Sequence, residues 1–236
     1  MVLGWKTFSL QRWLLLAGIL LLLAAGLLQQ LLLGNMGTFS LPGSEAITSS
    51  REGGFAQVLD SLLGFLVWPL LYTGYLYLAL RAVRGEAASL RDILAPFRHP
   101  LSVLGAYWLT TLVTIIGFVL LVIPGIAWGL KFMFSPLVAT DKGMTTVDAM
   151  AESGALTVGH RWALLGLMIV IAFPYLLAGA VGYLSLVEGL VPWGWWLLVV
   201  YGVELLVRPW LSASLAAAYH DLDGVRQALR SRLLEA

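Results

Sequence analysis

Cysteine, charge and catalytic motifs are what this sequence lacks. The chain has no Cys, which excludes disulfides, thiolate catalysis and cysteine-ligated metal sites. Charged residues make up 11% of it, against about 25% in soluble domains. A soluble globule with so few charges would expose large apolar patches to water. We therefore expect a protein whose outer surface faces lipid.

The motifs of common enzyme and binding classes are also missing. The chain has no G-x-S-x-G nucleophile elbow, no Walker A loop and no GxGxxG fingerprint. Its histidines, His99, His160 and His220, lack the i,i+4 spacing of a helical zinc site. A basic stripe interleaved with aromatics, which nucleic-acid binders show, is absent too. We expect no enzyme, no catalytic residues, no metal, no cofactor and no nucleic-acid partner.

What the chain has instead is apolar sequence, at 60% of its residues. A spanning helix needs about 20 mostly apolar residues. A cleaved signal peptide is the competing interpretation of the first segment, but no A-x-A-like site follows it. We predict an all-α fold, a single polytopic transmembrane bundle over residues 1–236 with about six spans. The predicted spans are residues 13–33, 61–80, 102–123, 126–140, 162–187 and 193–218.

The fourth segment is short for a span. Its 15 residues rise about 22 Å at 1.5 Å each, less than the ~30 Å hydrocarbon core. Pro124-Gly125 precedes it, and proline interrupts the helical hydrogen-bond ladder. We predict a helix break at Pro124 and Gly125. Either the fourth helix continues toward Lys142, or segments three and four form a kinked hairpin.

Cations are distributed asymmetrically about these segments. If the segments alternate in direction, eleven of the fourteen Lys and Arg residues fall on one face. Arg51 falls opposite, and Lys131 and Arg208 fall within the membrane. Short loops rich in Lys and Arg stay cytoplasmic. We predict a multi-pass protein of the cytoplasmic (inner) membrane, with both termini in the cytoplasm and outer connections at 34–54, 124–125 and 188–192.

Three stretches on the predicted inner side read as short amphipathic helices, at about 89–97, 145–158 and 222–233. Ser89 with Asp92 and Thr145 with Asp148 resemble capping boxes. The expected apolar faces are Leu90, Ile93, Leu94 and Phe97; Val147, Met150 and Ala151; and Leu222, Val225, Leu229 and Leu233. These helices lie in the membrane interface or cap the bundle from below. Basic residues beside them would attract anionic lipids.

Each of these stretches follows two apolar segments, which suggests a threefold repeat of hairpin and surface helix. His99 and His160 each follow one such stretch. Leu104-Gly105 and Leu165-Gly166 then follow at the same offset. The hypothesis requires three hairpins of similar structure.

Three charges fall inside the predicted membrane core. Glu204 and Arg208 lie four residues apart on one helix face, and Glu204 is about 16 Å deep counted from residue 193. A lone charge there costs about 2.5–3.5 kcal/mol on insertion scales. Lys131 would lie well inside if segment four begins at the outer face. Lys131, Glu204 and Arg208 form our candidate buried polar site, either an ion pair that fixes helix packing or a site for a substrate, lipid headgroup or ion.

Several short motifs, taken in their order along the chain, resemble the sequence pattern of a known family. The chain resembles a broad prokaryotic family of integral membrane proteins of unknown function, related to the membrane-domain family named after glycerophosphoryl diester phosphodiesterases. The matching residues are Ile123-Pro124-Gly125-Ile126, Lys131, Ser135-Pro136-Leu137-Val138, Asp148-Ala149-Met150, Ser153, Gly159-His160 and Tyr219-His220-Asp221-Leu222. Asp148, His220 and Asp223 depart from the family's Glu, Arg and final Arg. The resemblance implies fold and location, and it does not imply the soluble phosphodiesterase activity.

Two function classes follow from these observations. The first is a non-catalytic integral membrane protein with an accessory, scaffold or membrane-organising role. The alternative is a small transporter or lipid-handling protein that uses the Lys131, Glu204 and Arg208 site, since transporters place broken helices and ion sites near the midplane. The expected partners are the lipid bilayer, other membrane proteins and anionic lipids.

Overall fold

The computed structural model describes residues 2–33, 54–188 and 193–235, and every regular element in them is helical. The predicted all-α class is therefore confirmed. The elements in chain order are α1 (Val2–Leu33), α2 (Gly54–Val83), the 3-10 helix η2 (Leu90–Arg98), α3 (Pro100–Leu120), α4 (Val122–Phe132), α5 (Ser135–Lys142), α6 (Thr146–Leu156), α7 (Arg161–Glu188) and α8 (Trp193–Glu235).

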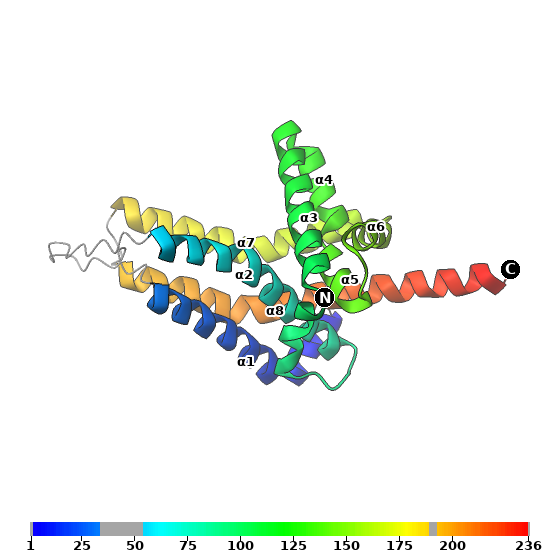
Figure 1. The fold of residues 1–236 in the computed structure, drawn as a ribbon, viewed down its shortest axis with the longest axis horizontal. Helices are drawn as coiled ribbons and strands as arrows, with labels where there is room; N and C mark the ends of the chain where they lie inside the picture. The colour runs from blue at the N-terminus through cyan, green and yellow to red at the C-terminus, as the bar shows by residue number, and fades with distance from the viewer. Residues whose placement is uncertain (1, 34–53, 189–192, 236) are drawn as a thin grey trace.

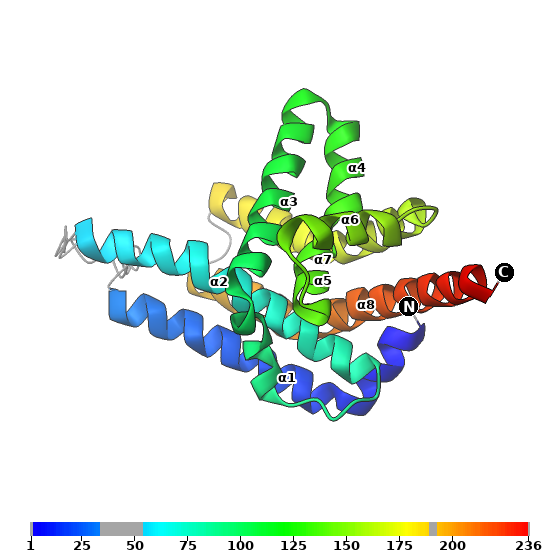
Figure 2. The same cartoon turned by 45° about the vertical axis from the view of Figure 1, so that its right-hand side comes forward.

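Four long helices, α1, α2, α7 and α8, form the main bundle (Figure 1). α8 packs against α1 and α2, and α7 packs along α8. The first turns of α1 and the last turns of α8 lie toward the same side, while α1 ends and α2 begins toward the opposite side (Figure 2). Large apolar side chains such as Val58 and Phe65 lie on the exposed face of α2, as in a helix that meets lipid.

The hairpin of α3 and α4 projects from this bundle and runs across its direction in both views (Figures 1 and 2). The two helices pack closely because glycines face each other. A Cβ added to Gly117 would lie 2.7 Å from the Cα of Gly125, and one added to Gly125 would lie 2.5 Å from the Phe118 ring. Small residues at such positions let helix backbones approach.

The break between these helices lies at Leu121, three residues before the predicted Pro124 and Gly125. Leu121 is extended, with φ −165° and ψ 150°. Pro124 and Gly125 both lie inside α4. Pro124 falls in the first turn of the helix, where backbone N–H groups have no partner within the helix, so proline is tolerated there. The kinked hairpin is confirmed, and the position of its break is corrected.

η2, α5 and α6 fill the junction between the bundle and the base of the hairpin (Figure 2). Met133 and Phe134 separate α4 from α5, so the predicted segment 126–140 falls on two helices. η2 lies against α2, where a Cβ on Gly74 would meet the carbonyl oxygen of Ile93 at 1.8 Å. Glycine at position 74 is therefore required for this contact.

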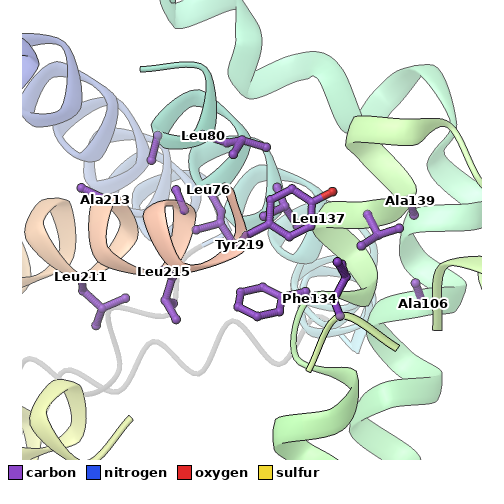
Figure 3. Close-up of a cluster of buried hydrophobic side chains, with 14 of the residues drawn as sticks. Leu76, Leu80, Ala106, Phe134, Leu137, Ala139, Leu211, Ala213, Leu215 and Tyr219 are labelled. Atoms are coloured by element: carbon purple, nitrogen blue, oxygen red, sulfur yellow. The ribbon is translucent and has the colours of Figure 1, made fainter. Parts of the chain in front are cut away.

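The main core lies where α2, α3, α5 and α8 meet (Figure 3). Phe134 and Tyr219 are fully buried at its centre, with ring centroids 5.7 Å apart. A second cluster joins α1 to α2 and η2 through Ile19, Tyr75 and Ile93. The core thus lies close to the junction, away from the tip of the hairpin.

Fewer helices qualify as spans than the sequence suggested. By length and composition, three described stretches could cross a bilayer, Val58–Val83, Pro100–Leu120 and Val122–Lys142. Thr146–Leu156 and Arg161–Leu177 qualify only together, and they are bent by 100°. The structure therefore supports a multi-pass membrane protein with three or four candidate spans, not six.

The lower count concerns the predicted spans outside α2, α3 and α4, since Val58–Val83, Pro100–Leu120 and Val122–Lys142 correspond to three of the six predicted segments. The predicted spans 13–33, 162–187 and 193–218 fall within α1, α7 and α8. Parts of them lie outside the described side chains, as do the connections 34–53 and 189–192 and Arg51. The described apolar stretch of α1 is the shorter Trp13–Gly26.

The first two predicted surface helices exist, but their buried faces differ from the expected ones. η2 buries Ile93 and Pro96, because a 3-10 helix has three residues per turn and aligns i with i+3. Leu94 and Phe97 are exposed. α6 buries Met150 but exposes Val147, since its inner face packs on α4 and α5.

The third predicted surface helix, 222–233, is the continuation of α8. The residues before it, 214–222, are mostly good helix formers, and a single glycine at 224 does not end a helix. The threefold repeat fails for the same reason. A crosswise, closely packed α3–α4 hairpin has no counterpart in α7 and the single long helix α8 (Figure 1).

Candidate functional site at the cationic end

The densest polar cluster lies where α2 ends and α5, α6 and the second half of α8 meet; we call this region the cationic end. Arg84, just after α2, binds the carboxylate of Asp141 on α5 through both guanidinium Nη atoms, at 2.6 and 2.7 Å. The Tyr219 hydroxyl of α8 donates to the same carboxylate at 3.0 Å. The Asp141 side chain is 7% exposed, so three elements share one nearly buried anion.

A second group of ion pairs adjoins the first. The Lys142 Nζ lies 3.0 Å from a carboxylate oxygen of Glu152 and 2.7 Å from one of Asp223. Arg226 binds the other oxygen of Glu152 at 2.9 Å. The Gln227 amide donates to Asp223 at 2.8 Å. α5, α6 and α8 are thus held together by two acids and two cations.

Local sequence signals place these groups. Asp141 and Lys142 occupy the last turn of α5, which Gly143 ends in the left-handed conformation with φ 62°, the usual role of glycine after a helix. Thr145 then caps α6, accepting from the Asp148 N–H at 3.4 Å. The tight turn between the end of α5 and the start of α6 brings Glu152 close to Lys142. The N-cap predicted at Thr145 is therefore confirmed. The complete capping box is the one predicted at Ser89 and Asp92, where the Ser89 N–H donates to the Asp92 carboxylate at 2.7 Å.

Hydrogen bonding at Arg84 and burial at Tyr219 keep these two groups protonated. Hydrogen bonds from Arg84 to Asp141 raise the pKa of the guanidinium, which stays charged at any working pH. Burial, followed by the nearby Asp141 charge, raises the pKa of Tyr219 far above its usual value, so the phenol stays protonated and donates to Asp141. An ion pair with so little exposure is strongly destabilised when one partner is removed, because the other is left as an uncompensated charge.

The sequence identified the cations of this cluster but missed their partners. Lys142 and Arg226 entered the prediction as cytoplasmic charges, and Asp223 only as a departure from a family motif. The available signal was the spacing of opposite charges along the final helix. Asp223 precedes Arg226 by three residues and Gln227 by four, which puts them on one helix face.

The candidate buried polar site of Lys131, Glu204 and Arg208 stays a prediction, because the Glu204 side chain lies outside the described residues. Lys131 lies at the base of the hairpin, with Nζ 4.8 Å from the Phe132 ring centroid and Cε against Gly154 of α6. The Arg208 guanidinium lies 5.8 Å from the ring centroid of Tyr72 on α2.

A smaller polar bridge joins α1 and α2 away from the cationic end. The Gln29 amide donates to Asp60 at 2.7 Å, and its oxygen accepts from the Trp68 indole at 2.8 Å. Gln29 interrupts an apolar run in the sequence, and this interruption has a structural role. A buried polar group that is fully hydrogen-bonded holds two helices in register.

Two cavities adjoin these helices. A small cleft of about 150 Å³ lies between α2, α3 and α5, and Tyr72, Tyr107 and Thr111 are among its lining residues. A larger groove of about 510 Å³ lies between α7 and α8. Its walls are mostly apolar, and His160 and Asp221 line it as well.

The charged groups of the cationic end are paired with one another. Its carboxylates are engaged by Arg, Lys, Tyr and Gln side chains. Among the side chains that the structure describes, no three His, Asp or Glu residues gather to hold a metal ion.

Comparison with known proteins found no relative of this chain. No family model, no curated protein and no solved structure matches the chain. The resemblance to a prokaryotic membrane family stays a prediction, and the case for function rests on the geometry of the helices, the ion pairs and the two cavities.

Proposed function

We propose that the protein is a non-catalytic accessory or scaffold protein of the cytoplasmic membrane, which presents the α3–α4 hairpin to another membrane protein. The observation that carries this proposal is the exposed tip of the hairpin. Val119, Leu121 and Ile123 are 81, 69 and 80% exposed. Contiguous apolar surface of this kind marks contact with lipid or with protein.

The base of the hairpin supports a role in presentation, because it is firmly attached. The Thr146 hydroxyl of α6 donates to the carbonyl of Ser102 on α3 at 3.2 Å. The Ser153 hydroxyl donates to the carbonyl of Lys131 on α4 at 3.0 Å. α6 is itself fixed to α5 and α8 through Glu152. A rigid support with an apolar tip is suited to bind a partner at low entropic cost.

The cationic end supports the same proposal and its orientation. Buried networks in which every charge is paired hold helices in a fixed arrangement, whereas catalytic sites leave acids and bases available for reaction. The surplus of Lys and Arg near these helix ends favours a cytoplasmic location for this side. Both termini would then lie in the cytoplasm.

Crosslinking in native membranes tests the proposal directly, and the lack of native Cys makes single-cysteine variants simple to prepare. Val119→Cys and Ile123→Cys would each carry a benzophenone maleimide. Leu176→Cys on α7, where the native residue is 70% exposed, is the control for lipid-facing positions. We expect a discrete protein adduct, identified by mass spectrometry, from both tip positions and not from position 176. Lipid adducts alone at all three positions would refute the scaffold role.

Transport is a second candidate, favoured by the cleft between α2, α3 and α5, which Tyr and Thr residues line together with apolar ones. The cleft includes Tyr72, whose ring lies beside Arg208, and it adjoins the break between α4 and α5 at Met133. Broken helices beside polar groups are typical of transporter sites. The 150 Å³ volume is small against the roughly 300–1,000 Å³ of most ligand sites, so we place this function second.

Labelling with a membrane-impermeant thiol reagent distinguishes the two candidates. Thr111→Cys places a thiol in the cleft, and Leu112→Cys places one on the exposed apolar side of the same helix. A transporter admits water to the cleft, so position 111 would react from one side of the membrane while position 112 would not. The scaffold proposal expects both thiols to remain unlabelled.

A further inference from the structure

Neither proposed function uses the groove between α7 and α8. Its volume is about 510 Å³, within the range of about 300–1,000 Å³ that ligand sites occupy. Gly166, Leu167 and Val170 line it from α7, and Ala217 and Ala218 line it from α8. A Cβ added to Gly166 would meet nothing within 4 Å, so the small residues here leave open space.

The length of the groove matches one leaflet of a bilayer. On α7 it extends from His160, at the start of the helix, to Val170. Ten residues at 1.5 Å each span about 15 Å, which is half of the ~30 Å hydrocarbon core. The groove begins at the cationic end, since its α8 wall includes Asp221 and Leu222, next to the Asp223 of the ion-pair network.

The mouth of the groove carries a carboxylate. Asp221 and His160 line it, and Asp221 is exposed. A lipid headgroup with an ammonium would complement the Asp221 carboxylate.

We propose that the α7–α8 groove binds one phospholipid of the leaflet at the cationic end, with one acyl chain along Gly166 and Val170 and the ammonium of an aminophospholipid headgroup at Asp221. The inference is independent of the scaffold role of the hairpin.

The test fills the groove and measures lipid retention. The full-length Gly166→Phe variant places a large side chain in the open space. Gly179→Phe is the matched control, because Gly179 lies on the same helix, is exposed and also has open space around its Cβ, but it does not line the groove. Both changes replace a helical glycine, which favours the helix. Each purified protein is titrated with phosphatidylethanolamine in detergent and examined by native mass spectrometry.

We expect the wild-type protein and Gly179→Phe to retain one phosphatidylethanolamine, and Gly166→Phe to bind it at least tenfold more weakly. Equal retention by all three proteins would overturn the proposal. Loss of a copurifying protein from Gly166→Phe, with lipid retention unchanged, would also overturn it and would assign the groove to a partner helix. If Gly166→Phe unfolds, as judged by its circular dichroism, Gly166→Leu makes the same test.

A separate experiment tests the headgroup assignment. Asp221→Asn removes the carboxylate at the mouth, and Asp148→Asn removes an exposed carboxylate on α6 that lies outside the groove. In competition between phosphatidylethanolamine and phosphatidylglycerol, we expect Asp221→Asn to abolish the preference for phosphatidylethanolamine and Asp148→Asn to preserve it. An unchanged preference in Asp221→Asn would refute the role of Asp221 in headgroup recognition.

Discussion

The cationic end and the α3–α4 hairpin are adjacent in the structure but differ in which side chains they bury and which they expose. At the cationic end, charged groups such as Asp141 and Glu152 are nearly buried and paired. At the hairpin tip, apolar groups such as Val119 and Ile123 are exposed. Charges must be paired where solvent is excluded, and apolar groups can remain exposed only where lipid or protein covers them. The first region therefore fixes the structure, and the second is available for contact.

Among the changes that test this comparison, removal of the Asp141 carboxylate should have the largest effect on the free energy of unfolding. Asp141→Leu leaves Arg84 without its carboxylate and Tyr219 without its acceptor. Breaking a buried ion pair from one side costs about 3–5 kcal/mol, so we expect the free energy of unfolding in detergent to fall by about that amount. Thermal unfolding followed by circular dichroism measures the loss.

The double variant Arg84→Met with Asp141→Leu is the control for this prediction. It removes both charges and replaces them with apolar side chains, which is often neutral at buried ion pairs. We expect it to recover most of the lost stability. A double variant as unstable as Asp141→Leu alone would show that the charge left on Arg84 is not the cause.

A change at the hairpin's packing contact should have an intermediate effect. Gly125→Val places a Cβ 2.5 Å from the Phe118 ring, and overpacking of this kind costs about 1–3 kcal/mol. Gly64→Val on α2 is the matched control, since a Cβ there meets nothing within 4 Å. Comparing thermal unfolding of the two variants measures the effect, and equal stability would contradict the close α3–α4 packing.

The smallest effect is expected at the tip itself. Ile123 is 80% exposed, so Ile123→Ser should change the unfolding free energy by less than about 0.5 kcal/mol. Ile93→Ala is the buried counterpart, because Ile93 is 1% exposed and such truncations cost about 2–5 kcal/mol. A large loss of stability in Ile123→Ser would place the tip in the folded core and remove it as a contact surface.

Prediction from sequence succeeded where one residue type or a local pattern was sufficient. The apolar runs gave helices, the spacing of Thr145 and Asp148 gave the cap of α6, and the segment around Pro124 gave a hairpin. Prediction failed where contacts between segments that are distant in the chain determine the structure. Leu121 rather than Pro124 breaks the helix, and the direction of α3 and α4 across the main bundle is not specified by apolar length (Figure 1).

The candidate site was predictable only in part for a related reason. Lys131 and Arg208 were recognisable as charges within apolar segments, but their contacts lie on different helices, α6 and α2. Lys142 and Arg226 were recognisable as cations of one face, and their shared partner Glu152 was not. Pairing between helices depends on their relative placement, and local spacing contains no information about it.

By itself the sequence determined that this chain is helical and belongs in a membrane, because 60% apolar and 11% charged residues leave few alternatives. It also determined the asymmetry of charge along the chain. Only the tertiary structure decided which carboxylate meets which cation, that α3 and α4 lie across the bundle (Figure 2), and that α7 and α8 leave a groove between them. The physical reason is that composition determines whether a segment is stable in water or in lipid. Contacts between segments that are distant in the chain determine how the helices are placed relative to one another.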